Sequence, residues 1–212
     1  LYTVRKTLLP ALPSWKKSQR SSPANPPLMR SIPLCRTGRP TAAIPLYGRS
    51  ADNIRDHRHV TSLLHRIETT DTGVLVTPTL SFDERGHQVN HMTYYCVGWS
   101  GNGEKPVDFY PTAEDFVGEG GNFERPYAIV KNAEGVKAGT KIEGLEAVGG
   151  LHFSEITLEP EEECSYLIFT GITEDIQEIR NLSKTYTTRE KVLEELEKTK
   201  AYWQEKVNVA YH

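Results

Sequence analysis

The sequence contains no apolar run of 18 residues, so it predicts no membrane-spanning helix. It has three cysteines, Cys35, Cys96 and Cys164, which are odd in number and far apart. This spacing excludes a disulfide framework and a cysteine zinc site, and we expect a reducing compartment, the cytoplasm. With 25% charged and 37% hydrophobic residues over 212 positions, the composition is that of a folded globular protein.

Acidic residues are missing from the first 51 positions, which hold nine Lys/Arg and eight of the thirteen prolines. Residues 52–212 hold all 28 acids against 16 bases. Three explanations compete for the basic segment: a transit peptide, a basic arm for nucleic acid or an anionic surface, and a stretch foreign to the fold, such as a shifted reading frame. We favour the third, because the sequence changes character at Leu46 and carries no nucleic-acid motif. Residues 1–45 are therefore expected to be disordered or outside the fold.

The next part of the chain has the alternating apolar pattern and the turn residues of antiparallel strands. Strands are predicted at His59–Ile67, Val74–Phe82 and His91–Trp99. The first two are joined by a hairpin turn in which Gly73 takes a positive φ. Pro78 places its strand at a sheet edge or a bulge, because proline has no amide hydrogen for a ladder. A second turn is predicted at Asp83–Gly86.

The glycine-rich stretch from Ser100 to about Gly150 predicts a long loop with a functional or interface role. A second hairpin is predicted from Leu151–Leu158 and Cys164–Thr170. A short helix follows at Glu174–Leu182, with Ile176 and Ile179 facing inward. The predicted architecture is all-β and antiparallel, with a helical C-terminal appendage.

The C-terminal appendage is predicted to be a helix of roughly twenty residues. The capping box Thr187–Glu190 marks its start, because such a box satisfies the first free amides of a helix. One face of it is apolar and consists of Val192, Leu193, Leu196, Trp203 and Val207. A stripe of this width favours a helix that packs on a further domain.

Two motifs suggest chemistry that the rest of the sequence does not support. The pairs His57/His59 and His87/His91 could suggest zinc, but zinc needs three or four converging ligands and nothing brings the pairs together. We therefore predict no metal. The run Gly118–Gly121 is similar to a phosphate-binding loop, but it lacks the Lys-Ser/Thr that follows in such loops.

Catalytic carboxylates and nucleophiles are equally weakly supported. Asp115, Glu119 and Glu124 could supply a glycosidase acid/base pair, although clustered acids in a loop are more often solvated. The sequence has no Gly-x-Ser-x-Gly nucleophile elbow. Cys96 and Cys164 lie in predicted strands as small apolar fillers.

Four segments are distinctive, and they are Leu46–Arg66, Pro78–His87, Glu114–Gly121 and Leu193–Trp203. In this order they resemble the inverting disaccharide phosphorylases of glycoside hydrolase family 94, formerly glycosyltransferase family 36. The resemblance covers about residues 46–208. It implies a partial, galactose-mutarotase-like β-super-sandwich at 46–182 and a linker helix at 183–212.

The resemblance also implies a function. In that family an aspartic acid of an (α/α)6 barrel behind the linker helix acts as general acid, while inorganic phosphate attacks the anomeric carbon. The sequence ends at His212, before such a barrel, so we expect no catalytic residue in it and no cofactor beyond phosphate as the co-substrate of a full-length enzyme. Whether the chain by itself is an enzyme is left open.

The same resemblance implies a homodimer in which sandwich loops reach the mouth of an active site that cleaves a β-linked oligosaccharide. The residues expected near that substrate are Asp115, Glu119, Asn122 and Arg125. The expected role is that of a non-catalytic super-sandwich, without nucleic-acid or membrane partners. The alternative is a stand-alone carbohydrate-binding β-sandwich with aromatic side chains on an exposed strand face.

Overall fold

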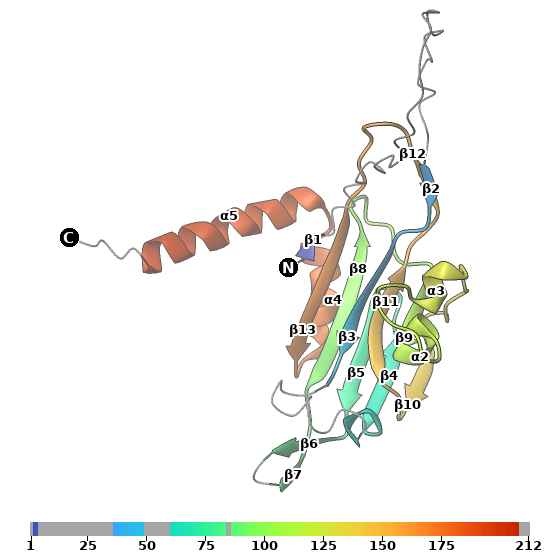
Figure 1. Cartoon of the computed structure of the whole chain (residues 1–212). Helices are drawn as coiled ribbons and strands as arrows, with labels where there is room; N and C mark the ends of the chain where they lie inside the picture. Colours follow the sequence, from blue (N-terminus) through green and yellow to red (C-terminus); the bar gives the residue numbers. More distant parts are fainter. Residues whose placement is uncertain (1, 4–35, 49–59, 84–85, 208–212) are drawn as a thin grey trace, which may run out of the picture.

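The computed structural model describes residues 2–3, 36–48, 60–83 and 86–207. Within them, an antiparallel sheet of six strands in the order β1-β13-β8-β5-β4-β10 runs through the middle of the molecule (Figure 1). Its strands are β1 (Tyr2–Thr3), β4 (His65–Thr69), β5 (Gly73–Pro78), β8 (Thr93–Ser100), β10 (Lys141–Glu143) and β13 (Tyr166–Thr173).

A second sheet, in the order β3-β11-β9, covers one face of the first. Its strands are β3 (Thr41–Leu46), β9 (Asp108–Thr112) and β11 (Ala147–His152). Short ribbons extend the two ends of the molecule, and they are β2 (Arg36–Gly38) with β12 (Ile156–Leu158), and β6 (Leu80–Asp83) with β7 (Gly86–Val89). All these pairings are antiparallel, so the predicted antiparallel β-sandwich is confirmed.

The apolar core lies between the two sheets. Val74, Val76 and Cys96 enter it from the first sheet and are fully buried. Phe109 and Leu151 meet them from the second sheet. Burying an aliphatic or aromatic side chain of this kind stabilises a fold by roughly 1.5–3 kcal/mol, so this layer holds the sandwich together.

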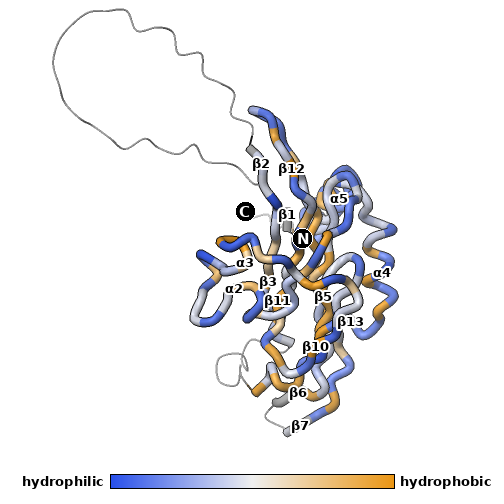
Figure 2. The backbone as a smooth tube through the Cα atoms, turned by 90° about the vertical axis from the view of Figure 1, so that its right-hand side faces the viewer, coloured by the Kyte–Doolittle hydropathy of each residue, from blue (hydrophilic) through white to orange (hydrophobic). Residues whose placement is uncertain are grey.

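Helix α4 (Ile176–Thr185) covers the opposite face of the six-stranded sheet. The alternate residues Leu75, Val97 and Trp99 point to that face, because successive side chains of a strand point to opposite sides. They pack with Ile179 of α4, so the central strands are buried on both faces. Helices α2 (Ala113–Val117) and α3 (Tyr127–Val130) lie on the far side, over the second sheet (Figure 2).

Helix α5 (Arg189–Lys206) points away from the sandwich (Figure 1). Both predicted C-terminal helices are therefore confirmed, but details differ. The first residue before α5 is Thr188 rather than Thr187, and its side chain makes no capping hydrogen bond. Ile176, which was expected to face inward, is 39% exposed. None of the helices in the described part of the chain has the length and apolar character needed to cross a bilayer.

The predicted hairpin turn after Ile67 and the predicted strand His91–Trp99 are confirmed. The predicted strand His59–Ile67 begins only at His65, because residues 60–62 are helical, and the predicted strand Val74–Phe82 is divided into β5 and β6. The centre of the second predicted turn, residues 84–85, lies outside the described ranges.

The reasons given for Gly73 and Pro78 are wrong. Gly73 does not have a positive φ. A Cβ there would lie 2.1 Å from the carbonyl oxygen of Cys96, so glycine is required where β5 approaches β8. Pro78 is not on an edge, since β5 lies between β8 and β4. Pairing with β8 ends at Val76, and the proline therefore falls beyond that ladder.

The prediction of a long loop from Ser100 to Gly150 is wrong, because β9, α2, α3, β10 and the first part of β11 lie there. The predicted hairpin of Leu151–Leu158 with Cys164–Thr170 is also wrong. Strand β12 pairs with β2, whereas β13 pairs with β8 and β1. The charged residues between them join two different sheets instead of closing a hairpin.

The folded unit begins earlier than Leu46, contrary to what composition suggested for residues 1–45. Strand β3 pairs with β11 along its whole length, from Thr41 to Leu46, and β2 pairs with β12. Tyr2–Thr3 pairs with β13. The residues between, 4–35, lie outside the described part of the chain. Lack of acids therefore did not mark the edge of the fold, because β3 is a short edge strand of small and apolar residues.

Candidate functional site

Asp115 is held at the start of α2 by the residue that caps this helix. The Thr112 hydroxyl accepts a hydrogen bond from the Asp115 amide at 3.1 Å and donates one to Asp115 Oδ2 at 2.6 Å. Such a cap satisfies an amide that the helix itself leaves free. One carboxylate oxygen of Asp115 is thus engaged, and Oδ1 remains for another donor.

The turn between α2 and α3 depends on Gly118 and Asn122. Gly118 has a φ of 78° and lies so near Tyr127 that a Cβ would be 2.7 Å from the tyrosine Cβ. Asn122 Oδ1 accepts hydrogen bonds from the amides of Glu124 and Arg125, each at 3.0 Å. Asn122 therefore shapes the turn, which is a structural role that the sequence did not indicate.

A hollow of about 350 Å³, called the α2 hollow here, lies between α2 and the segment after α3. Its lining includes Tyr110, Glu114, Asp115, Glu119, Tyr127 and Glu134. Two of the four predicted substrate-proximal residues, Asp115 and Glu119, thus lie on one hollow. The other two, Asn122 and Arg125, are exposed and do not line it.

A buried polar cluster that the sequence did not predict lies beneath this surface. Asp108 of β9 and His152 of β11 face each other across paired strands, with Asp108 Oδ1 2.6 Å from His152 Nδ1. Their side chains are 8% and 3% exposed. The Tyr110 hydroxyl lies 3.4 Å from the same His152 nitrogen and donates to the Ala133 carbonyl at 2.6 Å.

The electrostatics of the cluster keep Tyr110 protonated. Burial, and next the Asp108 carboxylate, raise the pKa of Tyr110 to about 12, while Arg39 acts in the opposite direction. The phenol therefore remains a hydrogen-bond donor at neutral pH. Its bond to Ala133 holds the segment after α3 against β9, together with the backbone bridge between Phe109 and Val136.

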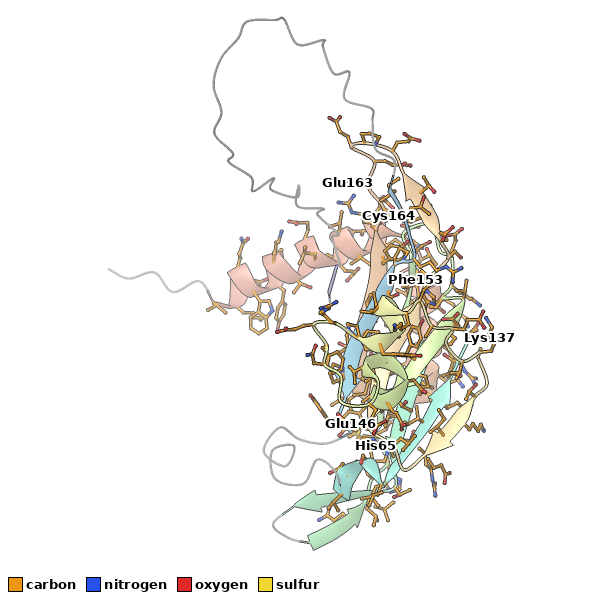
Figure 3. The ribbon with its side chains drawn as sticks, turned by 45° about the vertical axis from the view of Figure 1, so that its right-hand side comes forward. His65, Lys137, Glu146, Phe153, Glu163 and Cys164 are labelled. Atoms are coloured by element: carbon orange, nitrogen blue, oxygen red, sulfur yellow. The ribbon has the colours of Figure 1, made fainter. Side chains whose placement is uncertain are left out.

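A second hollow of about 360 Å³, called the β9 hollow here, lies above Asp108. Its lining includes Arg39, Asp108, Glu134, Lys137, Phe153, Ser154 and Glu155. Lys137 and Phe153 lie on the same flank of the molecule (Figure 3). Glu134 lines both hollows, so the two are neighbours.

His65, at the other end of the sandwich, is buried between two backbone carbonyls (Figure 3). Its Nδ1 lies 3.1 Å from the Leu145 oxygen and its Nε2 lies 3.0 Å from the Tyr47 oxygen. A carbonyl only accepts, so both contacts are hydrogen bonds at once only in the doubly protonated ring. The arrangement ties three segments together and does not resemble a metal ligand.

No three of the His, Cys, Asp and Glu side chains in the described ranges converge as a metal site would require. Of the histidines considered for zinc, His57 and His59 lie outside those ranges, and His91 is exposed. The structure therefore offers two hollows and a buried Asp–His–Tyr cluster, all on one side of the sandwich.

Comparison with known families identifies the family of the sandwich. The family model described as "Glycosyl hydrolase 94, supersandwich domain" matches residues 48–189, which is more than half of the chain. The matched range extends from just after β3 to the first residue of α5, so it covers nearly the whole sandwich. No curated protein matches the chain.

Proposed function

Because the chain belongs to the family of the glycosyl hydrolase 94 supersandwich domain, we propose that it is the non-catalytic sandwich of an inverting β-glycan disaccharide phosphorylase. The reaction class is glycosyl transfer to inorganic phosphate, which is the co-substrate rather than a bound cofactor. The observation that carries the proposal is the family match along the observed sandwich. The enzyme acts in carbohydrate metabolism and in the cytoplasm; the free thiols of Cys96 and Cys164 are compatible with a reducing compartment.

The α2 hollow is the part of the sandwich that we propose contributes to the mouth of the active site. Its carboxylates can accept hydrogen bonds from sugar hydroxyls. Tyr127, which is 51% exposed on the rim, offers a ring face for the apolar side of a sugar. In this proposal Asp115 and Glu119 contact the oligosaccharide, Asn122 holds the turn, and the exposed Arg125 lies at the rim.

Homodimerisation belongs to the same proposal. Large apolar side chains remain exposed beside the α2 hollow, among them Phe123 at 44%, Ile129 at 47% and Val130 at 54%. An apolar patch with a charged border is typical of a surface that a protein partner covers. A partner subunit at this place would lie next to the proposed active-site mouth.

The alternative, a stand-alone carbohydrate-binding module, receives less support. It requires aromatic rings on an exposed strand face, as expected from the sequence. Trp99, Phe109 and Tyr110 are strand residues but are only 2–3% exposed. The exposed rings of Phe123 and Tyr127 lie instead on the α2–α3 segment.

The test uses a fusion protein in which the barrel of a family 94 phosphorylase follows α5 of this chain in frame. The rate of cellobiose phosphorolysis is measured for this fusion. Asp115→Asn and Glu119→Gln should each raise KM roughly tenfold or more, since each loses a hydrogen bond between a charged group and substrate. Glu163→Gln is the matched control, because Glu163 is an exposed carboxylate that lines neither hollow. If the fusion is active and its KM for cellobiose is the same in both α2-hollow variants as in the parent fusion, the proposed contact is ruled out.

A further inference from the structure

Asp108 is a nearly buried carboxylate with one oxygen unused. Its Oδ1 is bonded to His152, but Oδ2 accepts no hydrogen bond from any residue in the described ranges. Leaving a buried carboxylate oxygen without a donor is costly, so such atoms normally face a ligand or water. Asp108 lines the β9 hollow. We take Oδ2, the oxygen that His152 does not occupy, as the acceptor that it offers there.

The rim of the β9 hollow supplies donors. Lys137 Nζ uses one of its three hydrogens on the Val107 carbonyl at 3.2 Å, which leaves two for another acceptor. Arg39 lies opposite, 3.8 Å from Glu155 across a half-exposed ion pair. A long, exposed pair of this kind is weak, so the guanidinium can turn to a ligand.

The charges of the hollow select the ligand. A phosphate or carboxylate only accepts hydrogen bonds and would be repelled by Asp108, Glu134 and Glu155. A metal ion or an amine would be repelled by Lys137 and Arg39. A neutral ring with neighbouring hydroxyls fits both, since a hydroxyl can donate to Asp108 and accept from Lys137.

We propose that the β9 hollow is a saccharide-binding site, with Asp108 as hydroxyl acceptor and Lys137 as donor. Its position next to the α2 hollow, with Glu134 between them, lets one β-linked oligosaccharide occupy both. His152 positions the Asp108 carboxylate from below. The choice of a β-linked sugar rests on the proposed function. The unused Asp108 oxygen and the Lys137 and Arg39 donors are features of the structure and do not depend on that proposal.

The experiment titrates the isotope-labelled full chain with cellobiose and follows the amide signals of Gly135, Lys137 and Ser154. Saturable shifts with a millimolar Kd are expected. Ser154→Trp should abolish them, because Ser154 lines the hollow and an indole there would occupy it, while Asp108 and His152 are left in place. Asp108→Asn should weaken binding by about tenfold, because a hydrogen bond to a charged acceptor is lost. Should Asp108→Asn not fold, Lys137→Met removes the donor instead.

Glu174→Trp adds the same ring at an exposed position away from the hollow and should leave the titration unchanged. The site is rejected if cellobiose gives no saturable shift, if Ser154→Trp leaves the shifts intact, or if phosphate or calcium gives them in place of cellobiose. Binding here, together with an active barrel fusion whose KM is the same in Asp115→Asn and Glu119→Gln as in the parent, would reject the proposed contact at the α2 hollow and keep the site. An active fusion whose KM rises in the α2-hollow variants, with no cellobiose binding at the β9 hollow, would keep the proposed function and reject the site.

Discussion

Helices α4 and α5 follow one another in the chain and both carry apolar residues along one face, more sharply separated in α4, but only α4 has that face covered. In α4, Ile179 is 6% exposed and packs on the sheet with Leu182 and the adjacent Tyr186. In α5, Val192 of the first turn is buried, whereas Leu196 is 40% and Trp203 57% exposed. An amphipathic pattern thus predicts a helix but does not identify the surface that it packs on.

The difference follows from the hydrogen bonds and rings at the start of the C-terminal segment. The Trp99 indole donates to the Tyr186 carbonyl at 2.9 Å and stacks on Phe169 at 5.0 Å. These contacts fix the chain at the end of α4. Beyond Val192, α5 is supported by exposed pairs within the helix, such as Lys198 with Glu194 and Glu195, which stabilise a helix only slightly.

The largest expected effect is the difference in stability between alanine variants of the two described tryptophans, Trp99 and Trp203. Trp99→Ala should lower the free energy of unfolding by about 3–5 kcal/mol, because it removes a buried ring, its stack and its hydrogen bond. Trp203→Ala should change it by less than about 0.5 kcal/mol, because that ring lies on the uncovered face. Chemical denaturation measures both. Equal losses would show that α5 is packed as firmly as α4.

A smaller effect is expected from the buried thiol of the sandwich. Burial raises the pKa of Cys96 to about 12, above the ordinary value near 8.5 of an unfolded thiol. The thiol's contribution to the free energy of unfolding is complete well below pH 8.5. It is lost as the pH rises towards 12, because in this range only the thiol of the unfolded chain ionises. Stability should therefore fall by about 2 kcal/mol between pH 8.5 and 10 from this group.

The control for the thiol is Cys96→Ala, which should remove this part of the pH dependence while lowering stability overall. A thiol reagent should modify Cys164, which is partly exposed, and leave Cys96 unmodified in the folded chain. Rapid modification of Cys96 at neutral pH would contradict the burial of this strand.

The smallest effect concerns local opening. An 18-residue helix with one covered turn is marginal in water. Amides between Glu195 and Glu205 should therefore exchange with solvent much faster than those of Ile179 and Leu182. Hydrogen exchange followed by mass spectrometry reads both segments in one sample, and equal protection would mean that a partner or a second copy covers α5.

The sequence predicts β5 and β8 best, because turn residues mark their ends. It places the start of β4 too early and does not predict β7. It fails for β9 and for most of β11, because the glycine-rich stretch from Ser100 to Gly150 suggests a loop. Gly149 and Gly150 are in fact strand residues at close approaches, since a Cβ would lie 2.2 Å from Cys96 Cβ or 2.5 Å from the Tyr110 oxygen. Only the neighbouring strands reveal why glycine is needed there.

The candidate site is predictable to a similar extent. Family resemblance pointed to Asp115 and Glu119, and both line a hollow. It did not point to Asp108 and His152, which lie 44 positions apart and meet only because β9 pairs with β11. A buried polar pair on two strands leaves no local signal, because each partner alone resembles an ordinary surface residue.

The most direct test of the non-catalytic role is an assay of the pure chain for glucose 1-phosphate release from cellobiose and cellodextrins with phosphate. The matching test with chitobiose follows the corresponding amino-sugar phosphate. No product above the blank is expected, because the proposed function places the general acid in the barrel and not in this sandwich. Turnover that copurifies with the chain, and that is lost in an α2-hollow variant such as Asp115→Asn, would show that this sandwich is itself catalytic.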